Sequence, residues 1–151
     1  EEILDSAEKN KTKIYLPIDF KIADKFTNDA NIKSIDIVNG IPTNWMGLDI
    51  GPKSIDKFIN IINISQTIIW NGPMGVFELD NFQEGSFRIA KKLSESTVFG
   101  KITIIGGGDT CACVTKFNFQ NKFSHLSTGG GASLKLLEGK KLEGLTCLQK
   151  N

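Results

Sequence analysis

Residues 102–110 read Ile-Thr-Ile-Ile-Gly-Gly-Gly-Asp-Thr and combine the groups that a protein uses to hold phosphate. Glycine lets the backbone pass close to a ligand, because no side chain stands between them. Residues 111–114 are expected to form the first turn of a helix, whose free N–H groups and dipole favour an anion. A carboxylate beside a phosphate cradle is typical of a Mg²⁺ site, so Asp109 is a candidate metal ligand.

Two further glycine-rich loops follow short strands without charge. Residues 71–75 read Asn-Gly-Pro-Met-Gly after an expected strand at 67–70, and residues 127–131 read Ser-Thr-Gly-Gly-Gly after one at 123–126. A single loop of this kind is as readily a plain turn as a binding site. Three are harder to explain by structure alone, because glycine costs roughly 0.5–1 kcal/mol relative to alanine in a regular element. The loops therefore predict a phosphate-binding edge.

The common nucleotide signatures are absent: the chain contains neither a G-x-x-x-x-G-K-[ST] nor a G-x-G-x-x-G motif. Glu78 follows soon after the second loop and could reach ribose hydroxyls, although a solvated acid is the plainer interpretation. His125 is the only histidine, and we expect a structural role for it, because phosphoryl transfer depends mostly on positioning. Trp45 and Trp70 are expected in the core rather than under a base.

Strands and helices alternate along the chain. The expected strands lie at 14–16, 35–38, 46–50, 67–70, 102–105 and 123–126. The expected helices are the end of one at 1–11, one that begins at Pro52, one at 82–96, one after the central glycines and one ended by Gly139, with loop and edge structure at 19–31. This alternation predicts an α/β fold with a doubly wound, mainly parallel, Rossmann-like sheet. Right-handed crossovers place the carboxyl ends of all these strands, and hence the three loops, on one edge.

The composition sets broad limits on function. With 151 residues, 40% of them hydrophobic and 23% charged, the chain is one domain or part of a larger one. A formal charge of +1 gives no reason to expect a nucleic acid or a membrane surface as partner. No apolar run approaches the roughly 18 residues of a membrane span. The three cysteines form no disulfide framework and are expected as reduced, buried thiols, so a cytoplasmic location is the default.

Four longer motifs resemble those of the phosphoglycerate kinases. They lie at 70–78, 106–110, 127–132 and 45–52, and Ala-Asp-Lys-Phe at 23–26 fits the same pattern. The resemblance extends over nearly the whole chain, in the family's order and spacing. It implies the C-terminal portion of an enzyme that passes phosphate between 1,3-bisphosphoglycerate and ADP, giving 3-phosphoglycerate and ATP, with Mg²⁺, in glycolysis. In that family the C-terminal domain binds the nucleotide.

The resemblance assigns roles along the nucleoside. It implies that Gly47 lines the adenine pocket and that Gly72 and Pro73 touch the nucleoside. Glu78 corresponds to the residue that contacts the ribose.

The resemblance also assigns roles along the phosphates. It implies that Asp109 carries Mg²⁺, that Thr110 contacts the α-phosphate and that Asn71 lies near the outer phosphates. Three backbone N–H groups would face the transferring phosphoryl, where donors must meet charge on its equatorial oxygens. They belong to Gly108, Gly129 and Gly130.

The family's N-terminal domain and the first half of its nucleotide domain have no counterpart in the chain. Arg88 is the only arginine, which fits the absence of the basic residues that bind the glycerate. Residues 1–151 are thus expected to be a partial nucleotide-binding domain with a tail at 140–151, inactive alone, from a family whose full-length members are monomers. 3-Phosphoglycerate would bind through the absent domain. The alternative is a non-catalytic nucleotide-binding or interaction module on the same fold.

Overall fold

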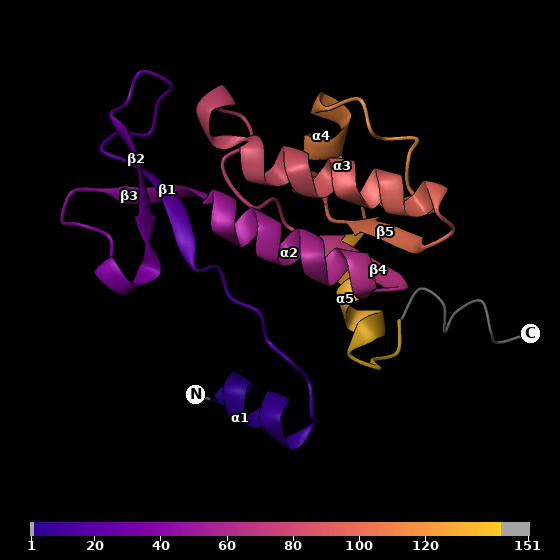
Figure 1. Cartoon of the computed structure of the whole chain (residues 1–151). Coiled ribbons are helices and arrows are strands. Elements are labelled where there is room, and N and C mark those ends of the chain that lie inside the picture. Colours follow the sequence, from indigo (N-terminus) through magenta and orange to yellow (C-terminus); the bar gives the residue numbers. More distant parts are fainter. Residues whose placement is uncertain (1, 143–151) are drawn as a thin grey trace, which may run out of the picture.

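The computed structural model describes residues 2–142 and contains five α-helices and six strands in that part of the chain (Figure 1). The α-helices are α1 (Glu2–Lys9), α2 (Pro52–Ile64), α3 (Glu84–Val98), α4 (Gly108–Lys116) and α5 (Gly130–Leu137). The strands are β1 (Asp19–Ala23), β2 (Ile32–Asp36), β3 (Met46–Ile50), β4 (Thr67–Asn71), β5 (Ile102–Gly106) and β6 (His125–Ser127). Short 3-10 helices lie at Ile37–Asn39 and Asp80–Phe82.

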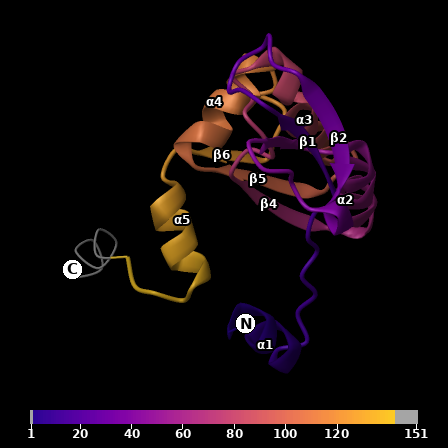
Figure 2. The same ribbon diagram turned by 90° about the vertical axis from the view of Figure 1, so that its left-hand side faces the viewer.

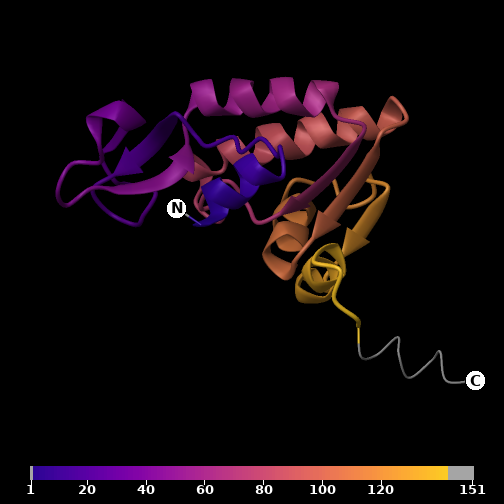
Figure 3. The ribbon, with the colours of Figure 1, turned by 90° about the horizontal axis from the view of Figure 1, so that it is seen from below.

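Strands β4, β5 and β6 form a parallel sheet in that order. In its register Ile69 of β4 stands beside Ile104 of β5, which stands beside His125 of β6. Helices α2 and α3 lie side by side over this sheet (Figure 3), and α3 and α4 both pack on β5. The predicted α/β class with a parallel, Rossmann-like sheet is therefore confirmed.

Strands β1, β2 and β3 form a separate antiparallel sheet in the order β2-β1-β3. The expectation that residues 35–38 and 46–50 belong to the same mainly parallel sheet as the glycine-loop strands is therefore wrong. A strand at 14–16 is also wrong, since residues 12–17 are irregular and β1 occupies Asp19–Ala23, which was expected to be loop. Pairing on both edges holds β1 in place despite its charged residues, because tertiary contacts override weak β propensity.

The helix boundaries agree with the predicted ones to within a few residues. Pro52 is the first residue of α2, and its apolar face buries Ile55 and Ile62. Helix α4 begins at Gly108, three residues before the expected 111–114 turn, because Gly107 ends the preceding loop at a φ of 95°. Strand β6 comes two residues later than the expected strand at 123–126.

The main core lies between the parallel sheet and its helices. Its buried members include Trp70, Ile105, Leu93 and Val114, so the core role expected for Trp70 is confirmed. The same expectation is wrong for Trp45, which is half-buried, with the Lys33 ammonium group 4.3 Å from its ring centre. Cys111 and Cys113 are buried free thiols, as expected, whereas Cys147 lies outside the described residues.

Helices α1 and α5 extend away from the rest of the molecule (Figures 1 and 2). No residue of α1 is buried, and Gly130 is the only buried residue of α5. Of the expected tail at 140–151, residues 140–142 are irregular and the remainder lies outside the described residues. Within the described part of the chain, no helix combines the length and the apolar character that crossing a membrane requires.

Candidate functional site

The three glycine loops meet at the carboxyl edge of the parallel sheet, as the topology predicts. The Gly107 N–H donates to the carbonyl oxygen of Ser127 at 3.0 Å, which joins the loop after β5 to the end of β6. The Gly72 N–H donates to the Thr110 hydroxyl at 2.8 Å, which joins the loop after β4 to α4. All three loops therefore form one connected edge.

Asn71 lies at the centre of this edge. A methyl group placed on Gly107 would lie 3.0 Å from the Asn71 side-chain oxygen, and one placed on Gly106 or Gly130 would lie 3.5 Å from its Nδ2. The amide is thus in contact range of both triple-glycine segments. The Nδ2 group is a neutral donor, and a donor in this position suits an oxyanion that spans the two loops.

The first turns of α4 and α5 begin at this edge. The first N–H groups of any helix have no partner inside it, and they lie here at Gly108, Asp109 and Thr110 in α4 and from Gly130 onward in α5. Gly108 is exposed, and a methyl group there would meet nothing within 4 Å. The open space above the α4 terminus leaves room for an anion to reach the amides.

Asp109 is exposed in the first turn of α4. No cluster of three or more His, Cys, Asp or Glu side chains that could hold a metal occurs among residues 2–142. A single carboxylate that faces a phosphate cradle fits Mg²⁺, which keeps several waters and takes one or two protein carboxylates together with substrate phosphates. The donor set therefore suits a metal that arrives with a nucleotide.

Thr110 differs from its neighbours, because its side chain is only 1% exposed. Its hydroxyl already accepts the Gly72 N–H, so the side chain links two loops at the edge. Its main-chain N–H is one of the first-turn amides of α4 that have no partner inside the helix.

The loop after β4 carries the predicted nucleoside contacts and is tied down at several points. The Met74 N–H donates to the Ser86 hydroxyl of α3 at 2.9 Å, and the Val76 N–H donates to the Leu48 carbonyl of β3 at 2.8 Å. The second bond brings β3 against the loop, although β3 belongs to the antiparallel sheet. Gly47 precedes Leu48 on β3 and is exposed, so this predicted residue lies beside the same loop.

Glu78 is exposed, and a residue on either side of it is bound by a lysine at the end of α4. The Lys116 ammonium group donates to the Phe77 carbonyl at 2.8 Å and to Asp80 Oδ1 at 3.0 Å. The helix that presents Asp109 thus also fixes the position of Glu78. This link could not be predicted, because the partners are nearly forty residues apart in the sequence.

We expect Lys116→Met to loosen the segment around Glu78, because the variant keeps the aliphatic chain and loses both hydrogen bonds. The free energy of unfolding should fall by only about 1 kcal/mol, since the ion pair is partly exposed. Urea unfolding measures the change in stability, and MgADP titration measures the effect of the loosened segment on nucleotide affinity. The control is Lys122→Met, since Lys122 is an exposed lysine in the loop after α4. Equal nucleotide affinity in both variants would contradict the assignment.

Two further buried carboxylates were not predicted, Asp19 and Asp49, each 3% exposed. Asp19 of β1 accepts the N–H groups of Lys53 and Ser54 at the start of α2, and Asp49 of β3 accepts the N–H of Gly85 at the start of α3. Both are strand residues that cap a helix distant in sequence. The only available signal was the set of glycines that make room for these two side chains.

Burial raises the pKa of Asp49 to about 6, although hydrogen bonds from the Gly85 and Ile50 amides lower it. The folded-state pKa thus lies above the unfolded value of 3.8, so the folded chain binds the proton more tightly, and stability is lost as the pH rises from about 4 through 6. We expect this loss to reach at most about 3 kcal/mol and to be absent in Asp49→Asn. Urea unfolding from pH 4 to 7.5 measures the difference between the two chains, and parallel profiles would refute the prediction.

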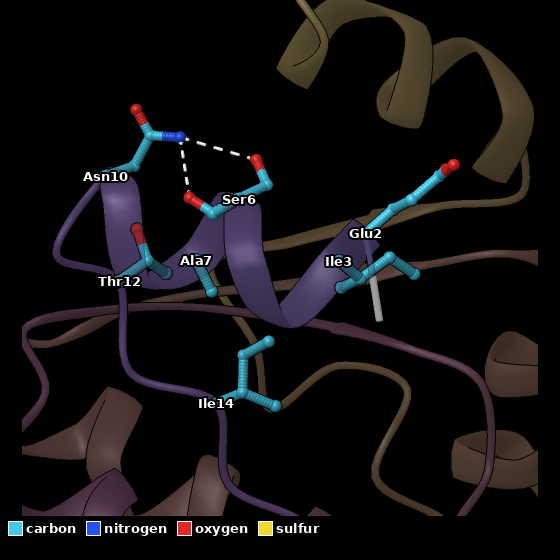
Figure 4. A pocket seen from close by; sticks show the side chains of 7 residues that line it. All are labelled: Glu2, Ile3, Ser6, Ala7, Asn10, Thr12 and Ile14. Carbon is cyan, nitrogen blue, oxygen red and sulfur yellow. Dashed lines mark hydrogen bonds between the residues drawn. The ribbon is translucent and has the colours of Figure 1, made fainter.

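Other polar or hollow features lie away from the edge. His125, for which a structural role is expected, is exposed on β6. Arg88 of α3 faces Asp56 at 3.8 Å and Glu84 at 3.7 Å. A hollow of about 370 Å³ beside α1 is lined by that helix and the segment after it (Figure 4). It offers no cation and lies on a helix without buried side chains, so it does not suit a phosphate.

Comparisons with known proteins agree with this geometry. The family model described as phosphoglycerate kinase matches residues 1–140. The chain is 54% identical to the phosphoglycerate kinase of Plasmodium falciparum and 53% identical to that of Dictyostelium discoideum, in each case over 97% of this chain and 35% of the relative. The solved phosphoglycerate kinase of Coxiella burnetii matches 92% of this chain and 35% of its own, with a TM-score of 0.84 and 34% identity.

The chain therefore spans about a third of the length of the curated relatives that it matches. The matched region includes both sheets and all three glycine loops. The chain belongs to the phosphoglycerate kinase family.

Proposed function

We propose that this chain is the C-terminal portion of a phosphoglycerate kinase and supplies part of the site that binds Mg-nucleotide. The reaction passes phosphate between 1,3-bisphosphoglycerate and ADP and gives 3-phosphoglycerate and ATP. The observation that carries the proposal is the connected edge, where Asn71, the α4 terminus and the α5 terminus lie together. Such an edge presents fixed N–H donors to a phosphate chain.

Each predicted residue receives a role in this proposal. Gly72 and Pro73 touch the nucleoside, Glu78 binds the ribose and Gly47 closes the adenine side. Along the phosphates, Asn71 and Thr110 hold oxygens, and the amides of Gly108, Gly129 and Gly130 face the group in transfer. Asp109 would hold Mg²⁺, which neutralises charge on the phosphates when it is bound.

The second substrate needs groups that the chain does not offer. A carboxylate and a phosphoester are usually held by arginine, which makes two parallel hydrogen bonds. Arg88 is the only arginine and lies on α3 beside Glu84 and Asp56. We therefore assign 3-phosphoglycerate to an N-terminal domain outside this chain and expect no turnover by the chain alone. The whole protein is proposed as a cytoplasmic monomer.

Calorimetric titration of the chain with ADP tests the proposal. We expect binding in the presence of Mg²⁺ that weakens in EDTA, and we expect Asp109→Asn to remove that difference while leaving the fold intact, because Asp109 is exposed. Lack of MgADP binding by the folded chain would refute the assignment. Turnover in a coupled ATP assay would refute the predicted inactivity.

The alternative, a non-catalytic interaction module, has one observation in its favour. Strand β4 is an edge strand of the parallel sheet, and Ile69 on it is 41% exposed. Exposed sheet edges and apolar side chains promote association. Concentration-dependent association together with indifference to nucleotide, measured by ultracentrifugation and calorimetry, would favour this module over the kinase site.

A further inference from the structure

The Asp49 carboxylate lies where β3, the loop after β4 and the start of α3 meet. Its Oδ2 accepts the Gly85 N–H at 2.8 Å, and its Oδ1 accepts the Ile50 N–H at 2.8 Å. It is 3% exposed and has no role in the predicted set of nucleotide contacts. A carboxylate is costly to bury unless hydrogen bonds or an opposite charge compensate it, so these two bonds are needed to hold Asp49 in place.

Two glycines make room for this carboxylate. A methyl group on Gly75 or on Gly85 would collide with Asp49 Oδ1. Gly75 ends the Asn-Gly-Pro-Met-Gly loop, and neither glycine has the positive φ that would otherwise require it. The loop and the α3 terminus have therefore closed around the Asp49 side chain.

Hydrogen bonds made by the neighbours of Asp49 hold the loop of residues 72–78, the nucleotide loop, which carries the predicted nucleoside contacts. Leu48, its neighbour on β3, accepts the Val76 N–H at 2.8 Å. Ser86, next to Gly85 on α3, accepts the Met74 N–H at 2.9 Å. The loop is thus held from β3 on one side and from α3 on the other, and Asp49 joins these two supports.

We propose that Asp49 is a positioning residue for nucleotide binding, which sets the loop of residues 72–78 against α3 so that Gly72, Pro73 and Glu78 face the nucleoside. This inference rests on the proposed function of those three residues. Asp49 itself touches no substrate. A variant that lacks the carboxylate oxygen bound to the Gly85 N–H frees the start of α3 from β3, and the loop then shifts together with α3.

Asp19 provides the matched control. It is as buried as Asp49, comes from the neighbouring strand β1 and caps a helix in the same way, through the Lys53 and Ser54 N–H groups of α2. Its bonds go to α2, whereas those of Asp49 go to the helix and strand that support the nucleotide loop. A general effect of losing a buried carboxylate should therefore appear in both variants.

The experiment compares Asp49→Asn with Asp19→Asn in the same chain, using hydrogen exchange of peptides that cover residues 72–78 and calorimetric MgADP titration. We expect Asp49→Asn to speed exchange in this loop and to weaken MgADP binding by about tenfold, the size of one lost charge-assisted hydrogen bond. Asp19→Asn should change neither, even if it lowers the melting temperature more. Equal exchange or equal affinity in the two variants overturns the inference.

The two proposals can fail separately. If the unmodified chain binds no MgADP, the proposed function fails, while loop exchange still reports whether Asp49 holds the loop.

If Asp49→Asn does not fold, the inference is tested on the unmodified chain instead, by following the chemical shifts of its amides by NMR between pH 4.5 and 7.5. The charged groups that act on the carboxylate are Lys21 of β1 and Glu84 of α3, and the carboxylate in turn acts on the Cys113 thiol of α4. We expect the Gly85, Gly75 and Gly72 amides to shift with a common midpoint near the Asp49 pKa of about 6. Absence of that midpoint at Gly75 and Gly72 overturns the inference.

Discussion

Replacement of Asp19 by alanine is expected to lower the free energy of unfolding by about 3–5 kcal/mol, because it leaves several buried donors without a partner. Asp19 accepts the Ser54 N–H at 2.7 Å, the Ser54 hydroxyl at 2.6 Å and the Lys53 N–H at 3.0 Å. The Ser54 hydroxyl in turn accepts the Ile18 and Asp19 N–H groups. One carboxylate thus joins β1 to the start of α2, and a methyl group on Gly51 would collide with it.

Asp36→Ala is the matched control for this prediction. The Asp36 carboxylate forms an ion pair with the Lys53 ammonium group at 2.7 Å, at the same end of α2 but on the surface. Exposed pairs of this kind contribute about 0–1 kcal/mol. Urea unfolding at pH 7 measures both variants, and a loss in Asp19→Ala no larger than in Asp36→Ala would show that the buried network does not hold the helix.

The charge state of Asp19 gives this stability a pH limit. Burial alone would raise the pKa of Asp19, but hydrogen bonds from the Ser54 side chain and the Lys53 and Ser54 amides together lower it. Because the folded-state pKa lies below the unfolded one, the stabilisation is present at neutral pH and is lost as the pH falls through the folded-state value. Asp49 acts in the opposite direction, so the two carboxylates favour different ends of the acid range.

The elements with a strong local pattern could be predicted from the sequence. Helix α2 has Pro52 at its first position and an apolar repeat that includes Ile55 and Ile62. Strand β5 is a run of β-favouring residues that ends in glycine. Such segments carry their own signal, in the period of their apolar residues and in the residues that begin or end them.

Strand β1 could not be predicted in the same way. Asp19 and Lys21 have low strand propensity, and the segment becomes a strand because β2 and β3 pair with both of its edges. The role of Asp19 depends on Ser54, which is 35 residues away. Contacts between residues so far apart in the sequence produce no periodic pattern. The antiparallel sheet and the capping role of Asp19 therefore could not be predicted and are seen only in the structure.

The candidate site shows the same division. Its location at one sheet edge followed from three strand–glycine segments and the crossover rule. The different roles of its glycines could not be predicted, because the sequence does not distinguish a glycine that packing requires from a glycine that leaves space for a ligand. In the structure Gly107 has a φ of 95°, whereas Gly108 has an ordinary φ and empty space around it.

Gly130 and Gly131 are adjacent, but packing requires a glycine at the first position, whereas the second has open space beside it. A methyl group on Gly130 would lie 2.7 Å from Gly107 Cα and 3.0 Å from Gly107 N, and both of these are backbone atoms. Neither can turn aside as a side chain would, so the start of α5 must move away from the loop after β5. A methyl group on Gly131 would meet nothing within 4 Å. The two alanine variants therefore differ only in whether the edge can stay closed.

We expect Gly130→Ala to lower the free energy of unfolding by about 1–3 kcal/mol, the usual cost of overpacking, and to abolish measurable MgATP binding. The donors of α4 and α5 would no longer face the same phosphate chain, and misplaced donors lose most of their electrostatic effect. Gly131→Ala should instead leave stability unchanged or raise it by up to about 1 kcal/mol, because alanine is the better helix former. Urea unfolding and calorimetry measure both variants. Retained MgATP affinity in Gly130→Ala would mean that contact between the two triple-glycine segments is not what shapes the nucleotide site.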